Sequence, residues 1–371
     1  MTIVFTGGGT GGHLYPAIAI ADALKTRANV RFIGTADRLE ATIVPQAGYL
    51  VEFIAARPLS RKVSIVTLRT LGTNLLGLVQ AMRLLLANRP DIVIASGGYV
   101  CFPVVLAARM LRMAGRLHAP IAVIEINARP GLTNRLIAPL ADEVWGAFAN
   151  ADSAFDGKYV HTGVPIRASL RALPQRFDAI RRLGLDPNRR TILIVGGSLG
   201  ARSLNVAAAA LITRRALPDD WQVLHVSGER DYEYMKAEES VPLGGNHARL
   251  FPYLTNMADA YAAADLVVAR SGASTLGELA ALGLPAILVP YPFAAENHQL
   301  ENAHVFEAAG AARILPDGDL NPDSLWWALD EVMKPSVLQT MRLAARSLAV
   351  ADPTARIVAR IDALLARKNA G

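Results

Sequence analysis

The stretch TIVFTGGGTGGHLYPAIAIADAL, residues 2–24, joins an apolar run to a helical pattern through a loop with five glycines. Glycine at such a junction gives up side-chain packing, so a cluster of it indicates that something approaches the main chain closely. A helix starting there would direct unpaired N–H groups at an anionic or polar ligand. Gly7, Gly9 and Gly12 also match the dinucleotide pattern G-x-G-x-x-G. On this loop alone, a dinucleotide site, a sugar-nucleotide or other polar-ligand site, and a structural turn all remain open.

Short apolar runs alternate with helical patterns along the rest of the chain. The runs are apolar on both sides, as in parallel strands that helices cover on both faces. We expect strands at residues 2–5, 30–33, 92–96, 121–125 and 143–146, and again at 191–196, 221–227, 266–270 and 286–290. We expect helices at residues 14–24, 204–216 and 278–282. This alternation predicts an α/β protein.

The same design occurs twice. The segment IVFTGGGTGGH, residues 3–13, is echoed by ILIVGGSLGAR, residues 192–202. Likewise IVIASGGYVCFP, residues 92–103, is echoed by LVVARSGASTLGE, residues 266–278. The repeat predicts two Rossmann-like domains that carry glycine-rich loops at the carboxyl ends of their strands and face one another across a cleft.

The domain limits follow from composition. At 371 residues the chain is long enough for two domains with separate cores. We expect the first domain at 1–165 and the second at 166–345, because the segment GVPIR follows the last strand of the first half. We expect residues 346–371 to form a final helix that crosses back to the first domain.

The excess positive charge lies in the first half of the chain. Residues 1–165 hold 16 Lys and Arg against 10 Asp and Glu, whereas residues 166–371 hold 22 of each. Nucleic acid is disfavoured as a partner, because the chain has no binding motif, no aromatic platform and no lysine-rich tail. Basic residues instead stand beside apolar ones, namely Arg61, Lys62, Arg69, Leu71, Leu75, Leu76, Leu78, Val79, Met82, Arg83 and Arg89, then Arg109, Met110, Leu111, Arg112, Met113 and Arg116. This composition favours contact with an anionic bilayer, and amphipathic helices packed on a sheet are the alternative.

Other features bear on the compartment. The longest apolar segment, residues 92–108, contains Gly97, Gly98 and Pro103, and it is better interpreted as strand, loop and helix than as a membrane span. The start of the chain has no pattern of a secretory signal, and the single Cys101 agrees with a reducing compartment. We therefore expect a cytoplasmic protein whose basic and apolar surface can rest on an anionic bilayer, with Cys101 in the core.

Several motifs together resemble the MurG family of bacterial peptidoglycan glycosyltransferases. They are the GGGTGGH loop, GTADRLE at 34–40, ASGGYVCFP at 95–103, PGLTNRLIA at 130–138, GVPIR at 163–167, VGGSLGAR at 195–202, SGASTLGELAALGLPAILVPYP at 271–292 and ENHQLENA at 296–303. The resemblance implies a GT-B fold, with an acceptor domain first and a sugar-nucleotide domain second. It implies transfer of N-acetylglucosamine from its UDP donor to the undecaprenyl-diphospho-muramoyl-pentapeptide.

The resemblance also implies a donor site in the second half. A glycine loop ahead of a helix suits Ser198 to bind a diphosphate, although helix capping is as common a role. By resemblance Glu278 accepts hydrogen bonds from ribose hydroxyls, Leu254 lies against uracil, Arg167 approaches from the hinge and Gln299 binds the transferred sugar. The remaining expected donor contacts are Asn127, Ala273, Ser274, Thr275, Leu276 and Gly277.

The first half is expected to supply the acceptor side and the base. Thr10, Gly11 and Gly12 would close around the donor sugar and the acceptor diphosphate. His13 titrates near neutral pH, so it is our candidate for removing the proton from the acceptor hydroxyl, with Glu125 as second candidate. The further residues expected on the acceptor side are Gly97, Gly98, Tyr99 and Asn134. We expect a single displacement with inversion, without cofactor or protein-held metal, since the chain has no Asp-x-Asp pair.

The chain departs from the family pattern at three positions. The family commonly has His-Glu-Gln-Asn where this chain has Ile124, Glu125, Ile126 and Asn127, and Leu199 stands where glutamine is usual. These changes leave the assignment of the UDP-sugar site largely intact, but the identity of the acceptor lipid stays open. A related GT-B enzyme acting on another lipid such as diacylglycerol, a non-catalytic UDP-sugar sensor and an NAD-dependent dehydrogenase are the alternatives. The dehydrogenase is disfavoured, because Asp37 fits poorly as the ribose-binding acid.

Overall fold

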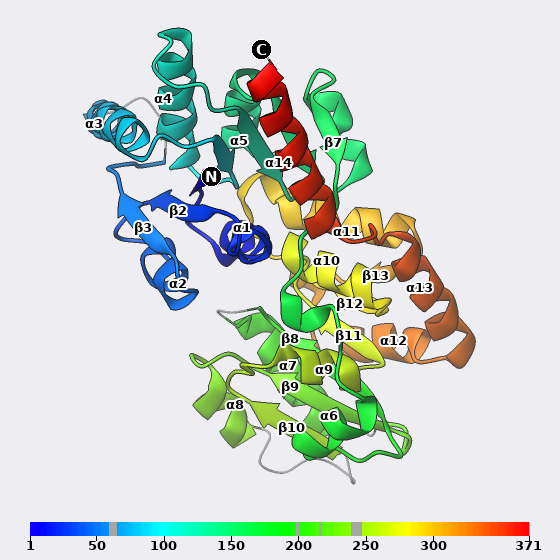
Figure 1. Cartoon of the computed structure of the whole chain (residues 1–371). Coiled ribbons are helices and arrows are strands. Elements are labelled where there is room, and N and C mark those ends of the chain that lie inside the picture. Colours follow the sequence, from blue (N-terminus) through cyan, green and yellow to red (C-terminus); the bar gives the residue numbers. More distant parts are fainter. Residues whose placement is uncertain (59–64, 198–199, 215–216, 239–246, 371) are drawn as a thin grey trace. The chain divides into compact units, whose positions relative to one another are not determined.

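The computed structural model describes residues 1–58, 65–197, 200–214, 217–238 and 247–370. The chain divides into two compact units (Figure 1). Unit 1 consists of Met1–Ile166 and Val350–Gly371, and unit 2 consists of Arg167–Ala349. The first and the last segments of the chain therefore belong to the same unit.

Unit 1 contains a sheet of seven parallel strands in the order β3-β2-β1-β4-β5-β6-β7. The strands are β1 (Thr2–Thr6), β2 (Asn29–Gly34), β3 (Leu50–Phe53), β4 (Ile92–Ala95), β5 (Ile121–Glu125), β6 (Glu143–Gly146) and β7 (Tyr159–His161). The strand order reverses between β1 and β4, as in doubly wound folds. Loops that leave these two strands therefore lie next to each other.

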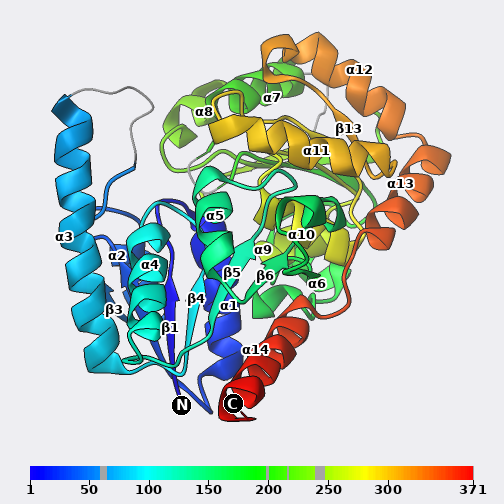
Figure 2. The ribbon, with the colours of Figure 1, turned by 90° about the horizontal axis from the view of Figure 1, so that it is seen from above.

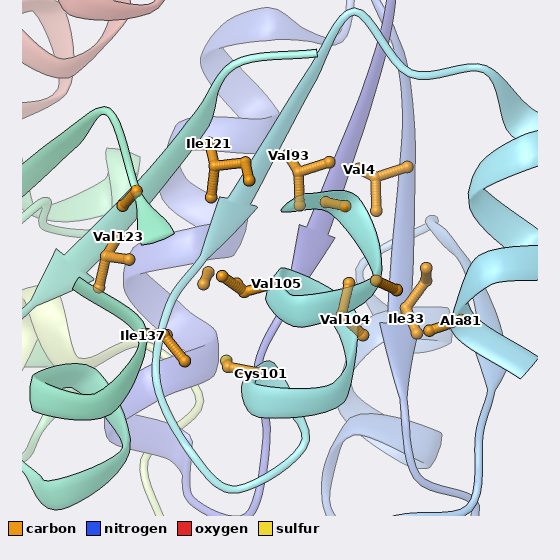
Figure 3. Packing of buried hydrophobic residues seen from close by; sticks show 14 of the residues in the cluster. Val4, Ile33, Ala81, Val93, Cys101, Val104, Val105, Ile121, Val123 and Ile137 are labelled. Carbon is orange, nitrogen blue, oxygen red and sulfur yellow. The ribbon is translucent and has the colours of Figure 1, made fainter. Parts of the chain in front are cut away.

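Helices cover both faces of this sheet (Figure 2). They are α1 (Gly11–Leu24), α2 (Glu40–Gln46), α3 (Ile65–Asn88), α4 (Cys101–Met113), α5 (Leu132–Ile137) and α14 (Pro353–Ala370), with short 3-10 turns at Ala138–Leu140 and Ala149–Ala154. The core between sheet and helices includes Val4, Val93 and Ile121 from the strands and Val104 from α4, all without exposed surface (Figure 3). Cys101 lies in this core, and burial raises the pKa of its thiol to about 12.

Unit 2 contains a sheet of six parallel strands in the order β10-β9-β8-β11-β12-β13. The strands are β8 (Arg190–Val195), β9 (Trp221–Val226), β10 (His247–Phe251), β11 (Leu266–Ala269), β12 (Ala286–Leu288) and β13 (Ala312–Ile314). The helices are α6 (Arg176–Arg182), α7 (Arg202–Arg214), α8 (Tyr232–Glu238), α9 (Met257–Ala263), α10 (Ala273–Leu282), α11 (His298–Ala308), α12 (Pro322–Val332) and α13 (Pro335–Ser347), with 3-10 turns at Ala168–Leu170, Ala295–Asn297 and Asp317–Asp319. The adjacent pair β8 and β11 corresponds to β1 and β4 of unit 1, which confirms the predicted repeat.

All nine predicted strands are present, and the structure adds four more. The added strands β3, β7, β10 and β13 are the two edges of each sheet. Edge strands are partly exposed, as the burial along β3 and β10 shows, so they lack the continuous apolar run that marks a central strand. The predicted helices begin too late, at α1, α7 and α10. At α1 and α10 the first turn contains small residues that carry no helical periodicity.

Candidate functional site

The glycine loop of unit 1 lies at the reversal point of its sheet. It follows β1, and the loop that follows β4 lies beside it, with the Gly8 N–H donating to the Gly97 carbonyl oxygen at 3.2 Å. Gly98 has a φ of +91°, and a Cβ at this position would overlap the Gly8 carbonyl oxygen. Ligands of doubly wound folds bind at this point outside the strand ends. The fold therefore brings together the first-half residues expected around one ligand.

The helix α1 begins immediately after this loop. Thr10 is its N-cap, with extended backbone, an exposed side chain and no capping hydrogen bond from its hydroxyl. Gly11 and Gly12 form the first turn rather than a loop before the helix, so the predicted start at residue 14 is wrong. Amides of a first turn have no partner within the helix, so they face outward as donors.

His13 is oriented by the second loop. Its Nδ1 lies 3.0 Å from the Ser96 carbonyl oxygen, and its ring is so close to Gly97 that a Cβ there would lie 2.6 Å from Cε1. A carbonyl oxygen only accepts, so Nδ1 carries the hydrogen and Nε2 keeps its lone pair in the neutral ring. In the neutral ring Nε2 is therefore the basic nitrogen.

Glu125 is buried, so its carboxylate does not face solvent in this structure. It is 1% exposed, and its carboxylate accepts hydrogen bonds from the Asn127 N–H (2.9 Å), the Gly131 N–H (3.1 Å) and Asn134 Nδ2 (2.9 Å). Burial raises the pKa of Glu125, while these hydrogen bonds act to lower it. The carboxylate thus ties the end of β5 to the start of α5, and a role for Glu125 as a base stays a prediction.

Asn134 also differs from expectation. It is 3% exposed and donates from Nδ2 to the Ile124 carbonyl oxygen at 3.0 Å as well as to Glu125. Its amide thus supports the end of β5, and its assignment to the acceptor side stays a prediction. Asn127 is 8% exposed, and its Nδ2 lies 3.3 Å from Glu125 Oε1.

Two further residues border the loops of unit 1. Tyr99 is half-buried, and the neighbouring Tyr99 hydroxyl raises the pKa of the exposed Arg38 guanidinium. Ile126 is 4% exposed, and its Cδ1 would lie 3.6 Å from a Cβ on Gly12. An apolar side chain therefore lies beside the glycine loop where the family pattern has a polar one.

Unit 2 repeats the arrangement with different chemistry. Ser198 and Leu199, in the loop after β8, lie outside the described residues. After β11 the chain passes to α10, whose N-cap Gly272 is extended and whose first turn contains Ala273, Ser274 and Thr275. The helix α10 starts at residue 273, five residues before the predicted start, so Leu276, Gly277 and Glu278 also lie in it.

Glu278 is held by two side chains of unit 2. It is 7% exposed, its Oε1 accepts from Arg167 Nη2 at 3.0 Å and its Oε2 accepts from the Tyr261 hydroxyl at 2.8 Å. Burial, and then the neighbouring Glu278 carboxylate, raise the pKa of Tyr261 well above its usual value. Arg167 and Glu278, two of the residues expected to bind the UDP-sugar, are thus in direct contact.

Gln299 and Leu254 lie in other loops of unit 2. Gln299 is in the first turn of α11, where its Oε1 accepts from the Tyr291 N–H at 3.0 Å and its carbonyl oxygen accepts from the Ser271 hydroxyl at 2.8 Å. The bond from Ser271 joins the loop before α10 to the start of α11. Leu254 is half-buried in the segment after β10.

Sequence reasoning missed two buried groups beside these residues. No role was predicted for Tyr261, and the sequence marks it only by its position in α9, the helix before β11. Glu40 is the last residue of a motif that the resemblance includes, yet no role was predicted for it. Within the described ranges, no group of three His, Cys, Asp or Glu side chains gathers as a metal site.

The helix α3 has an exposed apolar surface, which we call the α3 patch: Leu71, Leu75, Leu76 and Val79, exposed by 41–63%. The opposite side of the same helix, with Ala81 and Leu85 fully buried, packs into the core of unit 1. By length and composition the stretch Thr70–Asn88 could cross a membrane, with mean hydropathy 1.3 and 22% of it buried. Its packing on the core instead favours a helix that lies on a surface.

Two doubly wound units, each with glycine-rich loops at its reversal point, are the architecture of the GT-B fold. Comparison with known families agrees: residues 3–145 match the glycosyltransferase family 28 N-terminal domain, and residues 191–357 match its C-terminal domain. The chain belongs to glycosyltransferase family 28 and, within it, to the MurG family.

Curated relatives carry one name, UDP-N-acetylglucosamine–N-acetylmuramyl-(pentapeptide) pyrophosphoryl-undecaprenol N-acetylglucosamine transferase. The relative from Desulforamulus reducens is 36% identical over 100% of both chains, and that from Halalkalibacterium halodurans is 39% identical over 96% of both. The crystal structure of Acinetobacter baumannii MurG superposes with a TM-score of 0.78 at 28% identity, covering 97% of this chain and 99% of that one. Membership of a glycosyltransferase family removes the dehydrogenase alternative.

Proposed function

We propose that the chain transfers N-acetylglucosamine from UDP-N-acetylglucosamine to the lipid-linked muramoyl-pentapeptide, the step that converts lipid I to lipid II in peptidoglycan synthesis. The observation that carries this proposal is the full-length identity of 36–39% to relatives named for that reaction. The placement of the glycine loops at the reversal points of both sheets supports it.

His13 is the proposed general base. Its Nδ1 donates to the Ser96 carbonyl oxygen, so Nε2 is the basic nitrogen of the neutral ring. We assign to Nε2 the proton of the acceptor hydroxyl, which is transferred as that oxygen attacks the anomeric carbon. The carbon–oxygen bond to UDP breaks as the new bond forms, with inversion. The first-turn amides of α1 at Gly11 and Gly12, together with Thr10, are the proposed donors to sugar and diphosphate oxygens.

Unit 2 is the proposed donor-binding unit. We assign Glu278 to the ribose hydroxyls, with Arg167 and Tyr261 orienting its carboxylate. Gln299 is assigned to the transferred sugar and Leu254 to the uracil. Ser198 completes the diphosphate contacts in this proposal, with Ala273, Ser274, Thr275, Leu276 and Gly277 lining the start of α10.

Membrane contact is proposed for unit 1. The α3 patch is apolar, exposed Arg83 lies on the same helix and exposed Arg89 directly follows it, a composition that binds anionic lipid. An enzyme with an undecaprenyl-linked acceptor needs access to a bilayer. We therefore propose a peripheral location at the cytoplasmic face of the inner membrane, with Gly97, Gly98 and Tyr99 on the acceptor side.

The test is transfer of radiolabelled N-acetylglucosamine from its UDP donor to two acceptors, the undecaprenyl-linked muramoyl-pentapeptide and diacylglycerol. Transfer to the first alone is expected. Transfer to diacylglycerol alone would replace the proposed acceptor, and UDP binding without turnover on either acceptor would indicate a sensor. The diacylglycerol arm matters here because Ile124 and Ile126, buried at 2% and 4% exposure, replace polar residues of the family pattern.

A further inference from the structure

The segment GTADRLE, residues 34–40, ends in a buried carboxylate that the proposed function does not use. Glu40 is the first residue of α2 and is 1% exposed. Burying a carboxylate is costly unless hydrogen bonds replace its water, so its partners indicate what it is for.

Those partners include the glycine loop itself. Glu40 Oε2 accepts the Gly9 N–H at 3.0 Å. Glu40 Oε1 accepts the Thr35 N–H at 3.0 Å and the Thr35 hydroxyl at 2.6 Å. One oxygen is therefore anchored at the end of β2, while the other holds the main chain of the loop after β1.

The neighbouring glycines make room for this carboxylate. A Cβ on Gly8 would lie 2.6 Å from Glu40 Oε2, and a Cβ on Gly34 would lie 2.6 Å from Glu40 Cγ. Both distances are too short for any side chain. Gly9 has a φ of +84°, a conformation that favours glycine, and in it the Gly9 N–H is directed at Glu40. Part of the glycine cluster therefore serves Glu40 rather than a ligand.

The same segment also reaches the second loop. The Gly8 N–H donates to the Gly97 carbonyl oxygen at 3.2 Å, so the main chain that Glu40 holds is joined to the loop after β4. Glu40 therefore links the end of β2 directly to the loop after β1 and, through Gly8, to the loop after β4.

We infer that Glu40 is a positioning residue for the transfer reaction. It fixes the peptide between Gly8 and Gly9, and so orients the amides and the imidazole that follow, Thr10 to His13. It acts through the loop and does not touch substrate. This inference rests on the proposed function, because its readout is turnover.

The test compares Glu40→Gln with Asp142→Asn in the full chain. The amide in Glu40→Gln keeps the volume but presents N–H groups where the carboxylate only accepts, so at least one main-chain N–H loses its partner. Asp142 is a matched control in the same unit, because its carboxylate also accepts a main-chain N–H, that of Ile121 at 2.8 Å, and a side-chain donor, Arg112. Ile121 begins β5, so Asp142 lies at the amino-terminal ends of the strands, whereas the loops lie at their carboxyl ends.

We expect Glu40→Gln to lower kcat about 30-fold or more, with the KM for UDP-N-acetylglucosamine changed by less than about threefold, since misplacement of the loop affects the reacting geometry. Amide hydrogen exchange of a peptide covering residues 7–13 should become faster. Asp142→Asn should lower the melting temperature but leave kcat within about twofold, because distant sites act independently.

Equal kcat for the two variants, or exchange at residues 7–13 unchanged in Glu40→Gln, would overturn the inference while wild-type transfer still supported the proposed function. Absence of transfer by the wild type would instead reject the proposed function. If Glu40→Gln does not fold, Thr35→Val replaces it, since it removes only the hydroxyl donor to Oε1. A fall in kcat of about threefold is then expected, and no fall overturns the inference.

Discussion

At the scale of single residues, His13 carries the chemistry that we propose. His13→Ala should lower kcat by about 10²–10⁴-fold, the usual contribution of a general base, with little change in the KM for UDP-N-acetylglucosamine. Steady-state transfer kinetics on the lipid-linked acceptor measure this. His118→Ala is the control, because His118 is exposed and follows α4, away from the loops. Near-normal turnover of His13→Ala would remove the histidine from the mechanism.

A second residue-scale prediction concerns Asp231, a buried carboxylate of unit 2. Burial opposes its ionisation, but hydrogen bonds from Arg202, Arg230 and Asn205 outweigh it and lower the pKa of Asp231. A lowered folded-state pKa means that the stabilisation is fully present above the ordinary Asp value of about 3.9 and is lost as the pH falls through the folded value.

Asp231→Asn should therefore cost about 1–3 kcal/mol at pH 7, and this difference from wild type should shrink as the pH falls below about 4. Urea unfolding of both proteins between pH 7 and pH 3 measures it. A difference that stays constant over this range would show that Asp231 is not ionised at neutral pH in the folded protein. Arg202 is half exposed, which places the expected cost toward the lower end.

At the scale of elements, a charge substitution in the α3 patch tests whether this apolar surface binds a membrane. Leu75→Glu places a charge where Leu75 is 63% exposed, so it should reduce sedimentation with vesicles of anionic lipid about tenfold without lowering thermal stability. The matched control is Leu343→Glu on α13, where the leucine is 59% exposed. If both variants sediment like wild type, α3 is not the membrane contact.

The accuracy of strand and helix prediction also has a physical reason at this scale. Central strands such as β4 and β11 are buried on both faces and appear in the sequence as apolar runs. Edge strands such as β10, with the sequence HARLF, lack that run because one side meets solvent. Helix starts were displaced at α1 and α10, since glycine, serine and threonine in a first turn give no periodic signal.

At the scale of the whole molecule, the end of the chain completes unit 1. Glu143 on β6 is 4% exposed and accepts from Trp145 Nε1 at 2.9 Å and from Arg360 of α14 at 2.9 Å, with Arg367 at 3.3 Å. Arg360 lies 217 residues after Glu143 in the sequence. This ion-pair cluster thus fastens the last helix to β6, the strand beside the edge strand β7.

Arg360→Ala should destabilise the protein by about 1–3 kcal/mol, less than for a fully buried pair because Arg367 remains and Arg360 is about one-third exposed. Calorimetric unfolding measures this, and Arg356→Ala, an exposed arginine one turn earlier on α14, should change stability by less than about 0.5 kcal/mol. Equal effects of the two variants would mean that the cluster does not fasten α14.

Part of the candidate site could be predicted from the sequence, and part of it required the structure. The glycine loops, His13 and Glu278 were visible because their residue types are unusual at a strand-to-helix turn. Glu125, Asn134 and Tyr261 acquire their roles from burial and from partners, which spacing does not reveal. Glu125 illustrates this, since its place at a strand end does not reveal that two main-chain N–H groups and Asn134 donate to its carboxylate.

The order of apolar runs and glycine turns determined the α/β class, the twofold repeat and the family, because these depend on local periodicity and on residue types that tolerate close approach. Tertiary structure alone decided which strands are neighbours, and hence that the Gly8 and Gly97 loops meet and that Glu40 holds the main chain between them. Such contacts join segments 31 to 89 residues apart, and their geometry follows from sheet order and packing rather than from any local pattern.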